Sequence, residues 1–103
     1  MNKIWDEIIE LGATEGGTTL HRVAKLVEES GELASVILLK DGYKLNKYNL
    51  TDDEIQGEIL DEGADVLLVV FDLLNKEGFS KEEIKNSMAK KMIAWANVIE
   101  KTK

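Results

Sequence analysis

The chain has 103 residues, 20 of them acidic and 13 basic, so it has a net charge of −7 and contains neither cysteine nor proline. This length predicts one small domain, residues 1–103, and the acidic balance excludes general binding to nucleic-acid backbones. The lack of cysteine excludes disulfides, thiolate metal sites and cysteine nucleophiles, and without a signal peptide or a membrane-length apolar run we expect a cytoplasmic protein.

Apolar spacing predicts two helices in the first 40 residues. The first covers 2–11, and Gly12 is expected to break it before Gly16 and Gly17. The second begins after a cap at Thr18 or Thr19 and runs to about residue 40. Its apolar stripe, which we expect to face the core of a bundle, consists of Leu20, Val23, Ala24, Val27, Gly31, Ala34 and Leu38.

Two capping boxes predict the remaining helices. Thr51 with Glu54 opens a helix that runs to about residue 76 and ends before Gly78. Ser80 with Glu83 opens the last helix, which continues nearly to residue 103. The turn-rich stretch 41–50 is predicted to be a loop. Four helices without strand-like alternation predict an all-α, four-helix bundle-like domain.

Acidic residues recur at helical spacing in the second and third helices. In each helix an acid is followed three positions later by another, Glu29 by Glu32 and Glu62 by Asp65. If these helices pack antiparallel, the four carboxylates converge, and a divalent cation would relieve their repulsion. Oxygen-only ligands favour Mg²⁺ or Mn²⁺, with Ca²⁺ possible, over zinc or copper. The alternative is that both clusters are solvated helix faces, or that Asp65 is held by a salt bridge to a lysine.

Two segments resemble the signature of the MazG-like nucleoside triphosphate pyrophosphohydrolases. They are KLVEESGEL (25–33) and DEGADVLL (61–68), and the resemblance extends from about Leu20 to Asn97. The family's E-x-x-E and E-x-x-D pattern is matched by Glu29, Glu32, Glu62 and Asp65, which the resemblance implies are metal ligands. Three features depart from the family pattern: a spacer of 29 residues between the two motifs, Gly63 where the family usually has a helix-favouring residue, and the lack of an arginine near the end of the chain.

The resemblance implies Mg²⁺-dependent hydrolysis of a nucleoside triphosphate between its α and β phosphates, a reaction of nucleotide metabolism. It implies that Glu28 or Glu29 accepts the proton of the attacking water and that Lys25, Lys90 and Lys91 bind phosphate. Asn97 and Trp95 are candidates for contact with the base, although the place of Trp95 on an apolar stripe favours core packing. We also expect a homo-oligomer, a dimer or a tetramer, formed through the apolar stretch 66–74. The alternative function is a non-catalytic helical interaction module.

Overall fold

The computed structural model describes residues 2–103 as four helices without a strand, which confirms the prediction of an all-α chain. Their order is α1 Asn2–Glu15, α2 Thr19–Lys40, α3 Asp52–Lys76 and α4 Lys81–Lys101. The predicted caps are present, since the side chains of Thr18, Thr51 and Ser80 each accept a hydrogen bond from the backbone three residues on. Over the described residues, none of the helices is long and apolar enough to cross a membrane.

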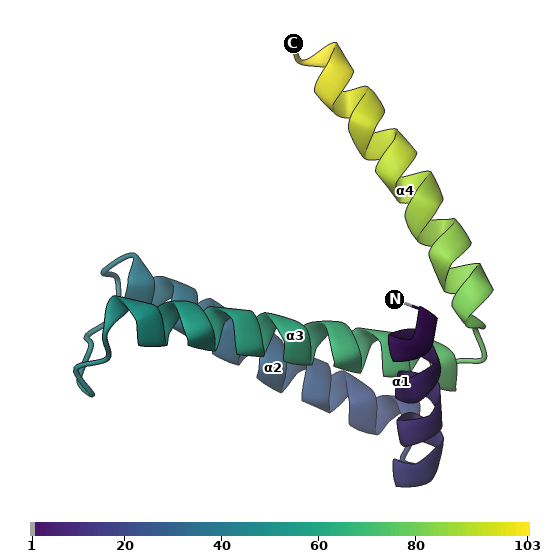
Figure 1. Ribbon diagram of the computed structural model, residues 1–103, viewed down its shortest axis with the longest axis horizontal. Helices are drawn as coiled ribbons and strands as arrows, with labels where there is room; N and C mark the ends of the chain where they lie inside the picture. Colours follow the sequence, from purple (N-terminus) through teal and green to yellow (C-terminus); the bar gives the residue numbers. More distant parts are fainter. Residues whose placement is uncertain (1) are drawn as a thin grey trace.

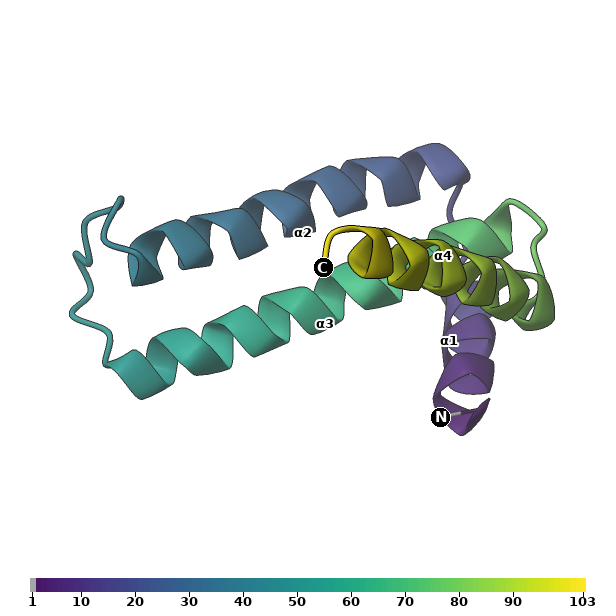
Figure 2. The ribbon, with the colours of Figure 1, turned by 90° about the horizontal axis from the view of Figure 1, so that it is seen from above.

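An antiparallel hairpin of α2 and α3 forms the main body of the protein (Figures 1 and 2). α1 lies across the end of this hairpin where α2 begins and α3 ends (Figure 1). There the ring of Trp5 packs on that of Phe71, with 4.4 Å between the ring centroids. The core is small, because the buried apolar side chains among the described residues are Ile55, Val69, Phe71 and Ile84.

Gly12 lies inside α1, so the prediction that it breaks this helix is wrong. The reason is tertiary, because a Cβ at this position would lie 2.0 Å from Oδ1 of Asp72 on α3. The carbonyl of Gly12 also accepts a hydrogen bond from Nζ of Lys76. A glycine is therefore required here for close approach of α1 to α3, and this need outweighs its low helix propensity.

The turn between α3 and α4 is closely hydrogen-bonded. Gly78 has a φ of +96°, and its N–H donates to the carbonyl of Asn75. Phe79 N–H donates to the carbonyl of Leu74, completing a Schellman motif, and the capping box at Ser80 follows directly. These bonds fix the direction in which α4 leaves the hairpin.

α4 points away from the other helices (Figure 1), so the single chain does not close into a compact bundle. Every residue from 86 to 103 is exposed. The radius of gyration is 16.8 Å, whereas a compact domain of this length has about 13 Å. Trp95 is 67% exposed, so the expectation that it packs in the core is wrong for the single chain.

The apolar stripe predicted for α2 also faces solvent, contrary to expectation. Leu20, Val27 and Leu38 are all exposed, and the face of α2 turned towards α3 instead holds Arg22 and Glu29, both buried. The sequence pattern identified an apolar face correctly but assigned it to the wrong side of the helix. The apolar face thus lies on the outside of the hairpin.

Candidate metal centre

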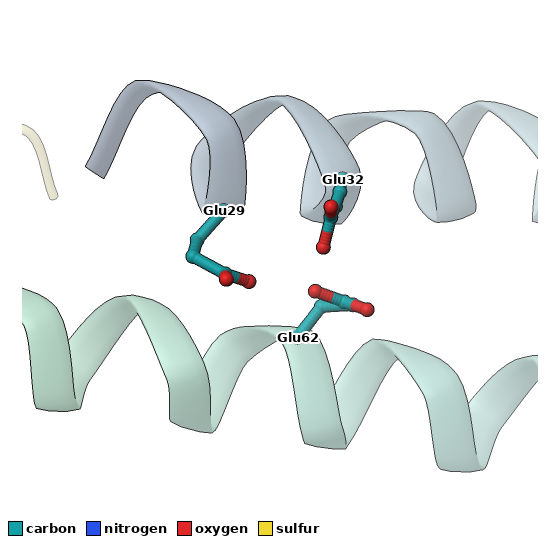
Figure 3. Close-up of side chains that lie close together, drawn as sticks. All are labelled: Glu29, Glu32 and Glu62. Carbon is teal, nitrogen blue, oxygen red and sulfur yellow. The ribbon is translucent and has the colours of Figure 1, made fainter. Parts of the chain in front are cut away.

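Three carboxylates meet between α2 and α3. Glu29 and Glu32 lie one turn apart on α2, and Glu62 points towards them from α3 (Figure 3). One oxygen from each lies within 4.8 Å of the other two. Ligand oxygens on an octahedral Mg²⁺ are at most about 4.2 Å apart, twice the metal–oxygen distance. A small movement of these side chains would therefore place all three on one cation.

Two oxygens of this cluster are buried without a hydrogen-bond partner among the described residues, Oε2 of Glu29 and Oε2 of Glu62. Glu29 as a whole is buried and Glu62 is half-buried, whereas Glu32 is exposed. Buried polar atoms in folded proteins are nearly always bonded, so unpartnered carboxylate oxygens indicate a missing ligand. A hard divalent cation suits them, because it accepts oxygen donors alone.

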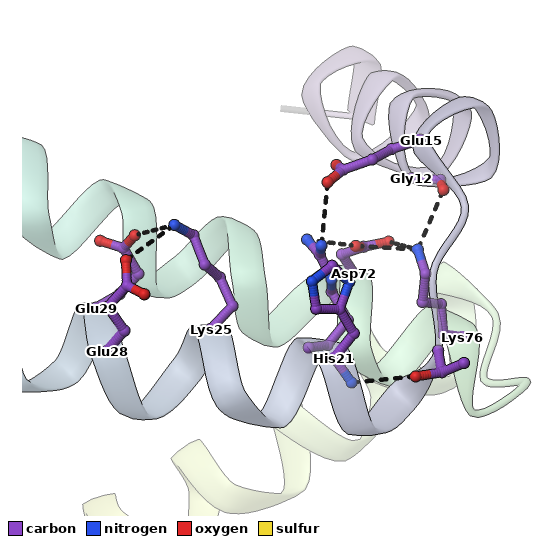
Figure 4. A network of polar contacts seen from close by, with 10 residues as sticks. Gly12, Glu15, His21, Lys25, Glu28, Glu29, Asp72 and Lys76 are labelled. Atoms are coloured by element: carbon purple, nitrogen blue, oxygen red, sulfur yellow. Dashed lines mark hydrogen bonds and ion pairs between the residues drawn. The ribbon is translucent and has the colours of Figure 1, made fainter.

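A lysine holds one side of the cluster. Nζ of Lys25 lies 3.1 Å from Oε1 of Glu29 and 3.1 Å from Oε1 of Glu28, both on its own helix (Figure 4). The hydrogen bond from Lys25 lowers the pKa of Glu29 despite its burial, and both partners raise the pKa of Lys25. Glu29 is thus kept ionised, with one oxygen bound to Lys25 and the other directed at the cluster.

Among the described residues no cation pairs with Glu62, and its titration is shifted in the opposite direction. Burial is the largest cause, followed by the contact with Glu32 and the negative charges of Glu32, Glu29 and Asp65, and together they raise the pKa of Glu62 to about 7. Without a cation, this carboxyl is therefore protonated over much of the acidic range. A bound cation would reverse this preference by favouring the ionised form.

The raised pKa makes the metal-free protein lose stability as the pH rises. The folded chain keeps the Glu62 proton up to about pH 7, whereas the unfolded chain releases it near 4.5, the ordinary value. Between these values the folded state binds more protons, so deprotonation favours unfolding. We expect the unfolding free energy of wild type, minus that of Glu62→Gln, to fall between pH 4.5 and pH 7. Urea denaturation in a chelator measures both, and a flat difference would contradict the shift.

Asp65 does not join the cluster of three. It is exposed, and its contribution is the charge that it adds one turn beyond Glu62. The apolar neighbours of Asp65 in the sequence suggested a buried carboxylate. Those neighbours lie on other sides of α3, however, and the side that carries Asp65 is exposed. Glu28 is likewise exposed and bound to Lys25.

The candidates on α4 lie far from the cluster within the same chain (Figure 1). Lys90, Lys91, Trp95 and Asn97 are all exposed on the part of the helix that points away from the hairpin. Of the predicted phosphate ligands, the structure therefore places Lys25 beside the acidic cluster. The other candidates could reach a cluster only on another copy of the chain.

Asp72 belongs to a separate buried network. Its Oδ1 lies 2.9 Å from Nζ of Lys76, and its Oδ2 lies 3.4 Å from Nη1 of Arg22 (Figure 4). Arg22 also binds Glu15 of α1 at 3.1 Å. The spacing of Lys76 four residues after Asp72 indicated the first pair, but nothing in the sequence indicated that Arg22 would lie opposite. The network joins three helices and is structural.

Comparisons with known proteins do not assign a role to these residues. No family model, curated protein or solved structure matches the chain.

Proposed function

We propose that this protein is a Mg²⁺-dependent nucleoside triphosphate pyrophosphohydrolase with a MazG-type arrangement of helices. It would cleave a ribo- or deoxyribonucleotide between the α and β phosphates, releasing the monophosphate and pyrophosphate. The observation that carries the proposal is the convergence of Glu29, Glu32 and Glu62 with two buried, unpartnered oxygens. The type of reaction is inferred from the resemblance of the sequence around these residues to the MazG-like family.

Glu29, Glu32 and Glu62 would hold the cation, and Asp65 is the proposed fourth ligand. A bound Mg²⁺ would supply the positive charge that lets a triphosphate approach this acidic surface and would stabilise charge developing on the phosphates. Mn²⁺ prefers similar ligands and would substitute for it.

Lys25 and Glu28 are placed to assist the reaction from α2. Lys25 lies at the edge of the cluster with its ammonium beside two carboxylates, where it would bind the departing pyrophosphate. Glu28 is exposed and borders the cluster, so it or Glu29 would accept the proton of the attacking water. Lys90, Lys91, Asn97 and Trp95 would contribute only from a second copy.

Self-association is part of the proposal, but its surface overlaps the predicted stretch 66–74 only in part. Within 66–74 the exposed residues are Leu67 and Leu68, because α1 and α2 cover most of the rest. The larger apolar surfaces are the outer faces of α2 and α3 and the exposed apolar residues of α4 beyond residue 85. A dimer would form if a second copy covered one of these faces, and a tetramer would form if further copies covered the others.

These apolar faces also favour the alternative, a non-catalytic helical interaction module. In that case the carboxylates would be an acidic surface without a ligand. The two buried unpartnered oxygens argue against this alternative, because the carboxylate oxygens of a solvated acidic face would be exposed to water.

An assay of pyrophosphate release tests the activity. Canonical, deoxy and modified nucleoside triphosphates are incubated with the protein and Mg²⁺, and we expect pyrophosphate and a monophosphate from at least one of them. Because loss of a residue that only supports a metal ligand costs about 10–100-fold, Glu62→Gln should lose about 100-fold or more. Glu58→Gln, an exposed acid one turn earlier on α3, is the matched control. Release of orthophosphate, or no turnover of any substrate, would refute the proposal.

A further inference from the structure

The single chain has a larger solvent-accessible surface than a compact monomer of its mass. Its accessible area is 7885 Å², whereas a compact monomer of 11.5 kDa exposes about 5,800 Å². The excess of about 2,000 Å² is more than twice the roughly 800 Å² that each partner buries in a standard protein interface. A partner is therefore needed, and the chemistry of the exposed surfaces indicates which one.

α4 carries an apolar stripe that is exposed over its length, with Met88 at its start bordering an apolar pocket beside Trp5 and Leu67. Met88, Met92, Trp95 and Ile99 recur at intervals of three or four residues, and all are exposed. The segment 84–99 around them contains three lysines and no acidic residue. This part of α4 is thus an amphipathic helix with positive charge.

The outer face of α3, on the side away from α2, has the opposite charge. Leu60 and Leu67 are 72% and 73% exposed, and with Gly57 and Ala64 between and before them they form an apolar stripe at helical spacing. Segment 51–65 contains seven acidic residues and no basic one. Asp61 and Asp65 lie along one edge of this stripe by helical spacing, both exposed.

We propose that two copies of the chain exchange α4, so that α4 of each lies along the outer face of α3 of the other. The apolar stripes would pack together, and Lys91, which borders the stripe of α4, would face the acidic edge of α3. The two helices have matching lengths, 21 and 25 residues. A reciprocal contact of this kind has twofold symmetry and closes on itself.

The turn after α3 explains why α4 does not cover its own α3. The Schellman motif at Gly78 and the capping box at Ser80 hold α4 away from the hairpin, and the salt bridge from Lys81 to Asp6 at 2.6 Å ties its first turn to α1. Closure within one chain would break these bonds. Exchange between chains keeps them.

The test is the mass in solution of charge-substituted variants, by light scattering. We expect a wild-type mass of at least two chains, and dissociation in both Leu60→Glu and Trp95→Glu, since each places a charge within an apolar contact. Ala94→Glu, on the opposite side of α4, is the control and should keep the wild-type mass. All three positions are exposed on helices, so circular dichroism should show that α1, α2 and α3 stay helical in each variant, with any loss of helix in the dissociated variants confined to α4.

Mixing the two dissociated variants distinguishes exchange from other interfaces. In the exchanged dimer, the intact α4 of Leu60→Glu meets the intact α3 of Trp95→Glu, so the mixture should recover one of the two contacts and with it a dimer. If α3 contacted α3 and α4 contacted α4, mixing would restore nothing, and the proposal would be wrong. A monomeric wild type would also overturn it. Should either variant unfold, Lys91→Glu takes its place, and unchanged self-association of that variant would count against the exchange. None of these readouts requires catalysis, so they stand apart from the proposed hydrolase activity.

Discussion

Mg²⁺ or Mn²⁺ is expected to raise the melting temperature of the wild-type protein and to leave that of Glu62→Gln almost unchanged. A ligand that binds the folded state at 100 times its dissociation constant adds about 2.7 kcal/mol of stability, which for a domain of this size is a shift on the order of 10 °C. The physical reason is the relief of repulsion among Glu29, Glu32 and Glu62, whose buried oxygens have no other partner. A thermal melt with and without each ion measures the effect.

Two controls make this measurement specific. Glu58→Gln removes a negative charge from an exposed position on the same helix and should keep the full response to metal. Na⁺ at equal ionic strength should not reproduce the shift, because screening acts on exposed charges rather than on a coordinated site. If Glu58→Gln and Glu62→Gln lost the response equally, binding would be a property of the overall charge and the metal centre would be excluded.

Asp72→Asn is expected to destabilise the protein by about 3–5 kcal/mol, because it leaves the buried Lys76 without a counter-charge and Arg22 with only the exposed Glu15. The side chains of Asp72, Arg22 and Lys76 are 10%, 9% and 15% exposed, so water cannot replace the lost partner. The amide has nearly the same shape as the carboxylate, which separates the effect of charge from that of packing. Urea denaturation at neutral pH and fixed protein concentration measures the loss.

The matched control for Asp72→Asn is Glu15→Gln. Glu15 binds the same arginine, but its side chain is 62% exposed, so removing its charge should cost less than about 1 kcal/mol. Equal losses in the two variants would mean that the network acts through general electrostatics rather than through buried pairing. Neither substitution touches the acidic cluster, so the response to metal should persist wherever the variant is folded.

Much of the candidate site could be predicted from spacing alone. Glu29 and Glu32 share a face because they are three residues apart, and an antiparallel partner helix brings Glu62 opposite them. The spacing could not show that Asp65, three residues further along, would point to solvent. That outcome depends on how α3 is rotated about its axis. Because α3 has two apolar faces, the sequence does not determine which of them is turned towards α2.

The same ambiguity explains what was missed in the fold. The helices and their caps follow from local signals at Thr18, Thr51 and Ser80, and these predictions were correct. Which face of α2 is covered is decided by tertiary contacts, and there the buried Arg22 and Glu29 displaced the apolar stripe. Gly12 shows the same limit, since its place within α1 depends on Asp72, 60 positions away in the sequence.

The exposure of α4 has a consequence for the order of the chain on dilution. A helix of this length is marginally stable in water when it stands alone, because nucleating its first turn is costly and no tertiary contact compensates for it. Met88 borders an apolar pocket beside α1 and α3, and the residues of α4 that follow it are all exposed. About a fifth of the helical residues, those of α4 from residue 86 onwards, are thus tied to assembly, and below the dissociation concentration they should relax towards coil while the α2–α3 hairpin remains.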